Sequence, residues 1–428
     1  MRTVPRIVVL GALWVGAAAP AAEGAPAAPR LPPGVSAALY DIAVPADRRP
    51  TPEQVALGEK LYNDKRLSID DSTSCATCHD PKRGFVDRKP TSAGVKGQKG
   101  QRNSPTVLNA MFNATQFWDG RAATLEDQAK LPILNPIEMG MPSPDAVVQK
   151  LRGIPEYVDG FKRVFGREIA YDDLARAIAA FERTQYSGNA RFDRFIAGDS
   201  KTLSAEEKRG WALFNGKGRC NTCHAGNAVN PLFSDQKFHN IGIAAHKQDF
   251  VDLAVEALKV VRTGDAKQID ELALQTKFSE LGRFLVTKQE NDIGAFKTPT
   301  LRNVGVTGPF MHDGSQATLW DVVDHYNKGG TANPFLDGGM QRLGMTDREV
   351  DDLVAFLVAL TSDDLKALER SELDRQRKAR NKRPEKDADQ ALGKKGHMGD
   401  VAPDPDLAKK DPANIGEWGP TGATGGGK

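Results

Sequence analysis

Apolar residues recur at helical spacing behind two capping boxes of the same kind. Residues 51–54 read Thr-Pro-Glu-Gln, and Leu57, Leu61 and Tyr62 follow on one face of the helix that this box would start. Residues 204–207 read Ser-Ala-Glu-Glu and precede a second run of aromatic and apolar residues. A capping box followed by one apolar face is typical of the first turns of an amphipathic helix. The pattern predicts two helices at equivalent points of a repeated unit.

Two more apolar stripes lie further along the chain, one after each of these helices. The first covers residues 171–186 and the second, behind another capping box, covers residues 346–360. Such stripes are typical of helices that pack into a core. Residues 249–290 are helical in pattern and charged, and are expected to form a surface excursion of the second domain. The repeat predicts a mainly α protein with two helical domains in tandem.

The composition divides the chain into five segments. Residues 1–22 carry two arginines, an apolar run and a small-residue region, as in a secretory signal peptide that is cleaved off. Residues 23–50 are rich in alanine and proline and are expected to be a flexible lead-in. An N-terminal domain at 51–195 and a C-terminal domain at 196–364 follow. Residues 365–428 are basic, then rich in glycine and proline, and are expected to form a disordered tail.

Two of these segments allow a second interpretation. The apolar run near the N-terminus is short for a membrane span, so we expect no stable membrane insertion, with an uncleaved anchor as the alternative. The basic tail is expected to be solvated, with a docking arm for an acidic partner as the alternative. The formal net charge of the chain is only +2, which predicts no long-range attraction to nucleic acid.

The candidate chemistry lies in a five-residue motif that occurs twice. It is formed by Cys75, Cys78 and His79 in the first copy and by Cys220, Cys223 and His224 in the second. Two cysteines three positions apart with a histidine directly behind them are typical of covalent c-type haem attachment. The two copies use all four cysteines of the chain. The sequence therefore predicts two covalently bound haem c groups.

In this interpretation the cysteine thiols bond the porphyrin, while His79 and His224 each supply the proximal nitrogen to an iron. The alternatives are a disulfide pair, a redox Cys-x-x-Cys and a zinc site. Neither motif is followed by the histidine pair of a zinc finger. Bacteria attach c-type haem outside the cytoplasm, so the motifs agree with the predicted signal peptide and with a periplasmic location.

Five further motifs resemble those of the bacterial dihaem cytochrome c peroxidase family. They are RNSPTVLN at 102–109, QFWDGR at 116–121, NPIEM at 135–139, FKTPTLRN at 296–303 and PFMHDG at 309–314. The resemblance runs from about residue 51 to about residue 362. It implies two cytochrome c-like helical haem domains, with hydrogen peroxide reacting at the N-terminal haem and electrons handled at the C-terminal one.

The resemblance also implies roles for three residues near the first haem. Glu138 matches the distal carboxylate that moves a proton during O–O cleavage, a task that suits a positioned carboxylate, and Gln128 matches its neighbour. Trp118 matches an indole between the two haems. The alternatives are a surface or capping acid at Glu138 and an ordinary packing aromatic at Trp118.

A calcium ion between the domains is a further implication of the resemblance. Asn103, Thr307 and Pro309 match the residues that bind it, two of them through backbone carbonyls, which a hard cation accepts. The chain has no carboxylate-rich calcium loop. The residues alone would not have predicted this ion.

Two departures from the family pattern distinguish this chain. The loop at 92–101 lacks the histidine that closes the peroxide site in many of these peroxidases, which predicts an open first haem. Fourteen residues after His312, where peroxidases place an axial methionine, stands Tyr326. A phenolate favours ferric and higher iron, whereas a thioether favours ferrous iron. Met311 or Met340 as the iron ligand, with Tyr326 as a buried aromatic, is the alternative.

An open first haem and a tyrosine-ligated second haem resemble the MauG type, whose members oxidise a partner protein. The primary expectation is therefore a periplasmic dihaem peroxidase that uses hydrogen peroxide to oxidise a periplasmic protein substrate. The alternative is a cytochrome c peroxidase that takes electrons from a small cytochrome c or cupredoxin. A third hypothesis, from another class, is a dihaem electron carrier without enzymatic activity.

Overall fold

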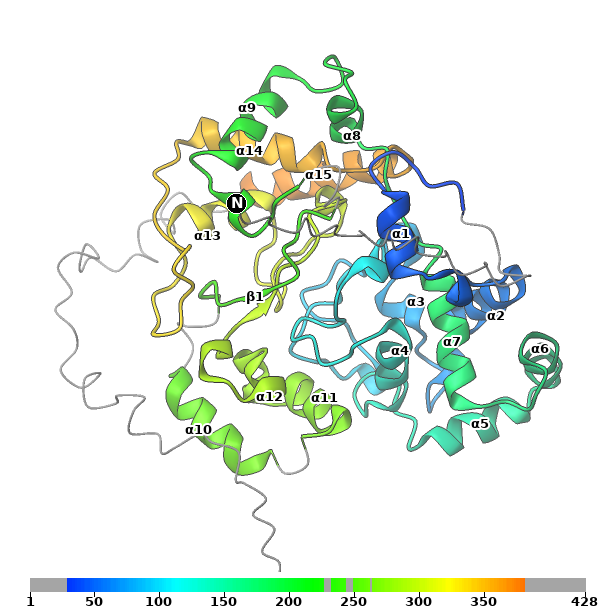
Figure 1. Cartoon of the computed structure of the whole chain (residues 1–428). Helices are drawn as coiled ribbons and strands as arrows, with labels where there is room; N and C mark the ends of the chain where they lie inside the picture. The colour runs from blue at the N-terminus through cyan, green and yellow to red at the C-terminus, as the bar shows by residue number, and fades with distance from the viewer. Residues whose placement is uncertain (1–28, 227–231, 244–248, 262–263, 382–428) are drawn as a thin grey trace, which may run out of the picture. The chain divides into compact units, whose positions relative to one another are not determined.

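The computed structural model describes residues 29–226, 232–243, 249–261 and 264–381, and these residues are mainly helical (Figure 1). The helices are α1 (Ala37–Ala43), α2 (Pro52–Asn63), α3 (Cys75–Cys78), α4 (Leu125–Leu134), α5 (Pro144–Arg152), α6 (Pro155–Phe165), α7 (Tyr171–Glu182), α8 (Arg191–Ile196), α9 (Ala205–Asn215), α10 (Phe250–Val260), α11 (Ala266–Gln275), α12 (Phe284–Thr287), α13 (Leu319–Asn327), α14 (Asp347–Val358) and α15 (Lys366–Asn381). Two short strands, β1 (Phe238–His239) and β2 (Phe296–Lys297), pair antiparallel. The predicted fold class is confirmed.

The helices predicted from capping boxes begin where expected. Thr51 caps α2, Ser204 caps α9 and Thr346 caps α14, each through a complete capping box. Each box satisfies two backbone donors that have no partner within the helix. The apolar faces behind the boxes enter the cores of the two halves.

Each half is built around a crossing of two helices, α2 with α7 in the first and α9 with α14 in the second. A glycine lies at each crossing. A Cβ atom at Gly58 would lie 1.8 Å from Ala177 O, and one at Gly210 would lie 2.0 Å from Asp352 O. The backbones of the paired helices therefore touch at one point, and only glycine fits there.

The cores of the two halves draw on separate parts of the chain. The first contains residues of α2, α4, α5, α6 and α7, and the second contains residues of α8, α9, α13 and α14. Helix α8 crosses the predicted boundary at 195/196, and its Phe192 packs in the second core. The boundaries at 51–195 and 196–364 stay predictions.

The expectation of a flexible lead-in at 23–50 is wrong for the residues described from 29 onward. Helix α1 lies there, and Val35, Tyr40 and Val44 are buried in a small apolar cluster that also contains Met111. These three apolar side chains are spaced among alanines and prolines, so the composition of the segment hid them. Residues 1–22, the predicted signal peptide, lie outside the described residues. In the described part of the chain, no helix is both long and apolar enough to cross a membrane.

The expectation of a disordered tail at 365–428 is wrong for its first part, because α15 occupies residues 366–381. The side chains of Glu372 and Gln376 on this helix are fully buried. Arg375 donates to Glu372, and the backbone N–H of Leu319 donates to Gln376. The helix is thus held by buried polar contacts, which an apolar periodicity does not reveal. The residues from 382 onward lie outside the described part.

Candidate functional site

The first Cys-x-x-Cys-His motif opens onto a cavity in the N-terminal half. Helix α3 supplies Cys75 and Cys78, and His79 follows at its C-terminal end. The side chains that line this cavity and carry candidate chemistry are Cys75, Cys78, His79, Trp118, Arg121, Gln128, Pro132, Glu138 and Glu182. The structure therefore brings together every residue predicted for the peroxide site.

Glu138 has the electrostatic properties of a proton-transfer group. Its Oε2 atom is buried and has no hydrogen-bond partner among the described residues. Burial, followed by the nearby negative charge of Asp270, raises the pKa of Glu138 to about 8, while Arg121 opposes the shift. A carboxyl group in this range can both hold and release a proton near neutral pH.

Glu182 is a second buried carboxyl group in the same cavity, and sequence reasoning missed it. It is the last residue of α7, its Oε2 has no hydrogen-bond partner among the described residues, and burial raises its pKa to about 8. Its position at the end of an apolar core helix gave no signal of chemistry. The first cavity thus holds two carboxyl groups that are neutral at moderately acidic pH.

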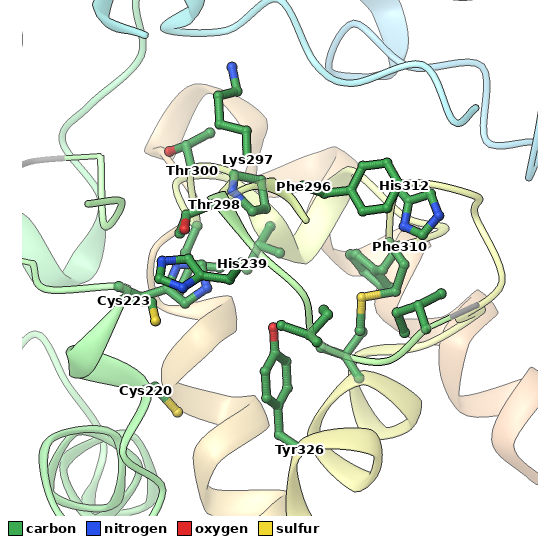
Figure 2. Close-up of a pocket in the computed structure, with 18 of the residues that line it drawn as sticks. Cys220, Cys223, His239, Phe296, Lys297, Thr298, Thr300, Phe310, His312 and Tyr326 are labelled. Carbon is green, nitrogen blue, oxygen red and sulfur yellow. The ribbon is translucent and has the colours of Figure 1, made fainter. Parts of the chain in front are cut away.

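The second motif opens onto a cavity in the C-terminal half (Figure 2). Tyr326 projects from α13, and its hydroxyl points into the space between Cys223 and Phe310 (Figure 2). Met311 and Met340 also line this cavity. The structure places the predicted ligand and both alternatives on the walls of one cavity, so Tyr326 as the iron ligand stays a prediction.

Burial favours the neutral form of both motif histidines, which is the form that binds iron. The Nδ1–H of His224 donates to Phe233 O at 2.8 Å, which leaves the lone pair on Nε2. Burial lowers the pKa of His224 and of His79. Both imidazoles are therefore neutral and able to coordinate a metal.

The two cavities are built on a repeat that extends well beyond the cysteine motifs. Thr124 caps α4 and Thr318 caps α13. Each residue of α13 that lines the second cavity follows its counterpart on α4 by the same number of positions in the sequence, and this number is the offset between the two halves. The lining residues of α4 are Leu125, Gln128, Ala129 and Pro132, and their counterparts on α13 are Leu319, Val322, Val323 and Tyr326. Pro132 thus occupies in the first half the place that Tyr326 occupies in the second.

The same offset relates the turns that precede these helices. Phe117 and Gly120 have positive φ angles of 67° and 68°, and Met311 and Gly314 have positive φ angles of 72° and 68°. Each turn is closed by a single antiparallel bridge. Trp118 and His312 are equivalent positions of the two turns.

Trp118 lies between the two cavities and lines both of them. Its indole Nε1–H donates to Asn103 O at 2.9 Å, and its carbonyl accepts from Lys297 N of β2 at 2.7 Å. Trp118 is therefore held from both halves of the chain, through its indole on one side and its backbone carbonyl on the other. The sequence analysis expects an indole between the two haem sites, and Trp118 lies between the two cavities.

His312 and His325 make hydrogen bonds to the protein. The ring of His312 stacks on Phe296 with centroids 3.6 Å apart, and its Nε2 lies 2.9 Å from Glu280 Oε2. The Nε2–H of His325 donates to Ile241 O at 2.8 Å. His239 lies between two carboxylates, with its Nε2 2.9 Å from Asp235 Oδ2 and its Nδ1 2.6 Å from Asp337 Oδ2.

The structure places the three predicted calcium residues at the second cavity. Asn103, Thr307 and Pro309 all line it. The amide of Asn103 donates to the carbonyls of Lys89 and Pro90, each at 3.1 Å. The calcium ion stays a prediction.

These observations fit two covalently attached haems. None of the four cysteines forms a disulfide. Each cysteine pair and its histidine line a cavity to which several helices contribute side chains. His224 lines the second cavity, and Glu138, whose buried Oε2 has no hydrogen-bond partner among the described residues, lines the first. When bound, the haems supply iron centres that react with peroxide and exchange electrons.

Comparison with known proteins gives the same assignment. A family model described as di-haem cytochrome c peroxidase matches residues 52–201. The cytochrome-c peroxidase IdrP1 of Denitromonas iodatirespirans is 41% identical over 357 residues, which are 82% of this chain and 92% of that protein. The methylamine utilization protein MauG of Methylorubrum extorquens is 39% identical over 319 residues, which are 73% of this chain and 79% of that protein.

A solved structure indicates the same family as these sequence matches. A MauG-like protein associated with microbial copper homeostasis superimposes with a TM-score of 0.63 at 30% identity, over 75% of this chain and 93% of that one. The family model includes the first cysteine motif, and the match to IdrP1 extends over 82% of the chain. The chain therefore belongs to the di-haem cytochrome c peroxidase family and is an oxidoreductase with two c-type haems.

Proposed function

We propose that this protein is a MauG-type peroxidase, which reduces hydrogen peroxide at the first haem and uses a tyrosine-ligated second haem in oxidising a partner protein in the periplasm. The observation that carries the proposal is the equivalence of Pro132 and Tyr326. Proline has no side-chain atom that can bind iron, whereas a tyrosine oxygen can. One scaffold thus supports an open first site and a closed second site.

The residues around the first cavity support a reaction with peroxide. The loop at 92–101 offers no histidine to close the site. Reducing one peroxide molecule to two waters consumes two electrons and two protons, and Glu138 is placed to move a proton between the two peroxide oxygens. Heterolytic O–O cleavage needs such a transfer, and general acid–base catalysis of this kind contributes about 10²–10⁴-fold to a rate.

The second cavity supports the use of the two oxidising equivalents at a distance. A phenolate from Tyr326 would stabilise iron in its ferric and higher states, which suits the storage of oxidising equivalents. Trp118, fixed between the cavities, shortens the path for electrons. The electrons would come from a side chain of the partner protein, which is oxidised.

A second candidate function is an ordinary cytochrome c peroxidase. Met311 and Met340 line the same cavity as Tyr326, and ligation by either would raise the potential of the second haem. The donor would then be a small cytochrome c or cupredoxin. The similarity to the peroxidase IdrP1 agrees with this candidate as well as with the first.

The two candidates separate in a peroxide-consumption assay with reduced cytochrome c as the donor. If Tyr326 ligates the second haem, the wild-type enzyme turns over slowly, and Tyr326→Met raises the rate because a thioether favours ferrous iron. Tyr186→Met, a tyrosine outside both cavities, serves as the control. A fast wild-type rate that Tyr326→Met leaves intact would contradict the proposal.

A matching experiment uses the natural partner. The MauG-type function predicts that tryptophan or tyrosine residues of a co-purifying periplasmic protein change in mass only when peroxide is present. Mass spectrometry of the partner, with and without peroxide, measures this directly. A partner that is never modified, together with rapid oxidation of a small redox protein, would favour the second candidate.

A further inference from the structure

The peroxide cavity is completed by a segment from the other half of the chain. Residues 249–290 were expected to form a surface excursion, but α11 of this segment contacts α4, and its Leu274 lines the first cavity. One residue of α11, Asp270, is buried with 3% of its surface exposed. A buried carboxylate needs compensating partners.

Asp270 finds these partners in the N-terminal half. Its Oδ1 accepts from Arg121 Nη2 at 2.6 Å and from Arg121 Nε at 2.9 Å, and its Oδ2 accepts from the amide of Asn135. Arg121 is shared with Asp119, whose carboxylate lies 3.0 Å away. Asp270 thus joins α11 to Arg121, in the segment before α4, and to Asn135, the residue directly after α4.

Asn135 in turn holds the turn that carries Glu138. The side-chain oxygen of Asn135 accepts from Ile137 N at 3.1 Å, and its carbonyl accepts from Glu138 N at 3.1 Å and from Gly140 N at 2.9 Å. Two contacts therefore connect Asp270 to the backbone of Glu138. Movement of the Asn135 amide would move the Glu138 carboxyl group.

Asp270 also contributes to the electrostatic environment of Glu138. The pKa of Glu138 is raised to about 8 by burial first and by Asp270 second, while Arg121 lowers it. These are the charged groups that face Glu138 from α11 and from the segment before α4. Loss of the Asp270 charge would favour the Glu138 carboxylate, and the freed Arg121 would act in the same direction.

We propose that Asp270 is a positioning residue for the peroxide reaction, which fixes the turn bearing Glu138 and supplies part of the charge around it. The first haem site is then a composite of both halves of the chain. This inference rests on the role of Glu138 in the proposed function. A merely structural ion pair between Asp270 and Arg121 would stabilise the fold without altering the pH dependence of the reaction.

The test measures the rate of peroxide reaction with the holoenzyme, by stopped flow, across the pH range in which Glu138 titrates. Asp270→Asn removes the charge but keeps an oxygen that can accept from Asn135. Asp270→Ala removes the charge and the acceptor. Glu271→Gln, the next residue on α11, removes one charge outside this network and is the matched control, and Glu138→Gln is the reference for loss of the acid.

The expected results differ between the two Asp270 variants. The rate rises with pH as Glu138 loses its proton, so a lowered Glu138 pKa in Asp270→Asn shifts the profile toward lower pH by about one unit. Asp270→Ala gives the same shift and also a lower plateau, by about 10²-fold, the loss that a displacement of about 1 Å can cause. Glu271→Gln keeps the wild-type profile.

Two results would overturn the inference, and they have different meanings. If Glu138→Gln lowers the rate while both Asp270 variants keep the profile of Glu271→Gln, Asp270 is only a structural residue. If Glu138→Gln itself reacts at the wild-type rate, Glu138 is not the distal acid, and the role of Asp270 fails with that part of the proposed function. Should Asp270→Ala not fold, the pH profile of Asp270→Asn decides alone.

Discussion

The two haem sites share one scaffold and differ at a few equivalent positions. Both use a Cys-x-x-Cys-His motif, a helix capped by threonine and a turn with positive φ angles. On the capped helix the first site has Pro132 where the second has Tyr326. In the proposed function, this one difference on a repeated helix leaves the first iron open to peroxide and closes the second.

The sites also differ at the position of Gln128. The first cavity contains Glu138, Glu182 and Gln128, whereas the position equivalent to Gln128 in the second cavity is Val322. Peroxide cleavage moves protons and benefits from polar side chains, but electron transfer does not require them. The carboxyl groups and Gln128 of the first cavity thus agree with the proton transfer proposed for that half.

The largest expected effect comes from making the first site resemble the second. Pro132→His places an imidazole where Tyr326 stands in the other half, so it should ligate the first iron and suppress the reaction with peroxide almost completely. Pro132→Ala is the matched control and should react like the wild type. Helix α4 should tolerate both changes, because proline is the least favourable residue inside a helix. The measurement is the peroxide reaction rate of each holoenzyme.

An unchanged rate of peroxide reaction in Pro132→His, with correct haem content, would contradict the equivalence of Pro132 and Tyr326. It would show that residue 132 does not face the iron of the first site. The optical spectrum provides a second readout, because ligation by the introduced histidine should convert the first haem to a low-spin form.

A smaller effect is expected from the glycines at the two helix crossings. Gly58→Ala and Gly210→Ala each place a Cβ within 2.0 Å of a backbone oxygen, and overpacking of this kind costs about 1–3 kcal/mol. Gly160→Ala is the matched control, since its Cβ would lie 3.4 Å from Leu57 Cδ1. Thermal unfolding followed at each haem should show destabilisation in the altered half. An equal loss of thermal stability in both halves would mean that the two halves do not unfold separately.

Much of the fold follows from the sequence, because capping boxes and apolar stripes are local signals. Those at Thr51, Ser204 and Thr346 begin helices as predicted. Helix α15 was missed because Glu372 and Gln376 are buried polar residues. The lead-in was misjudged because its apolar residues are few and separated. Local patterns thus predict helices with an apolar face and overlook helices held by polar contacts.

The site was predictable where a motif carries the chemistry. Cys75, Cys220 and their neighbours are recognisable by spacing alone, and the resemblance to a family supplied Glu138 and Trp118. Asp270 and Glu182 carry no motif, and their importance arises from contacts between distant parts of the chain. Pro132 could have been found, because the constant offset between α4 and α13 is present in the sequence.

The most direct test of the central claim is the electron paramagnetic resonance spectrum of the resting ferric enzyme, compared between the wild type and Tyr326→Phe. The account predicts one high-spin and one low-spin haem per chain in the wild type. Tyr326→Phe should change the low-spin signal and leave the high-spin signal intact. A low-spin signal identical in both proteins would contradict the account, because Tyr326 would then not be the ligand that closes the second site.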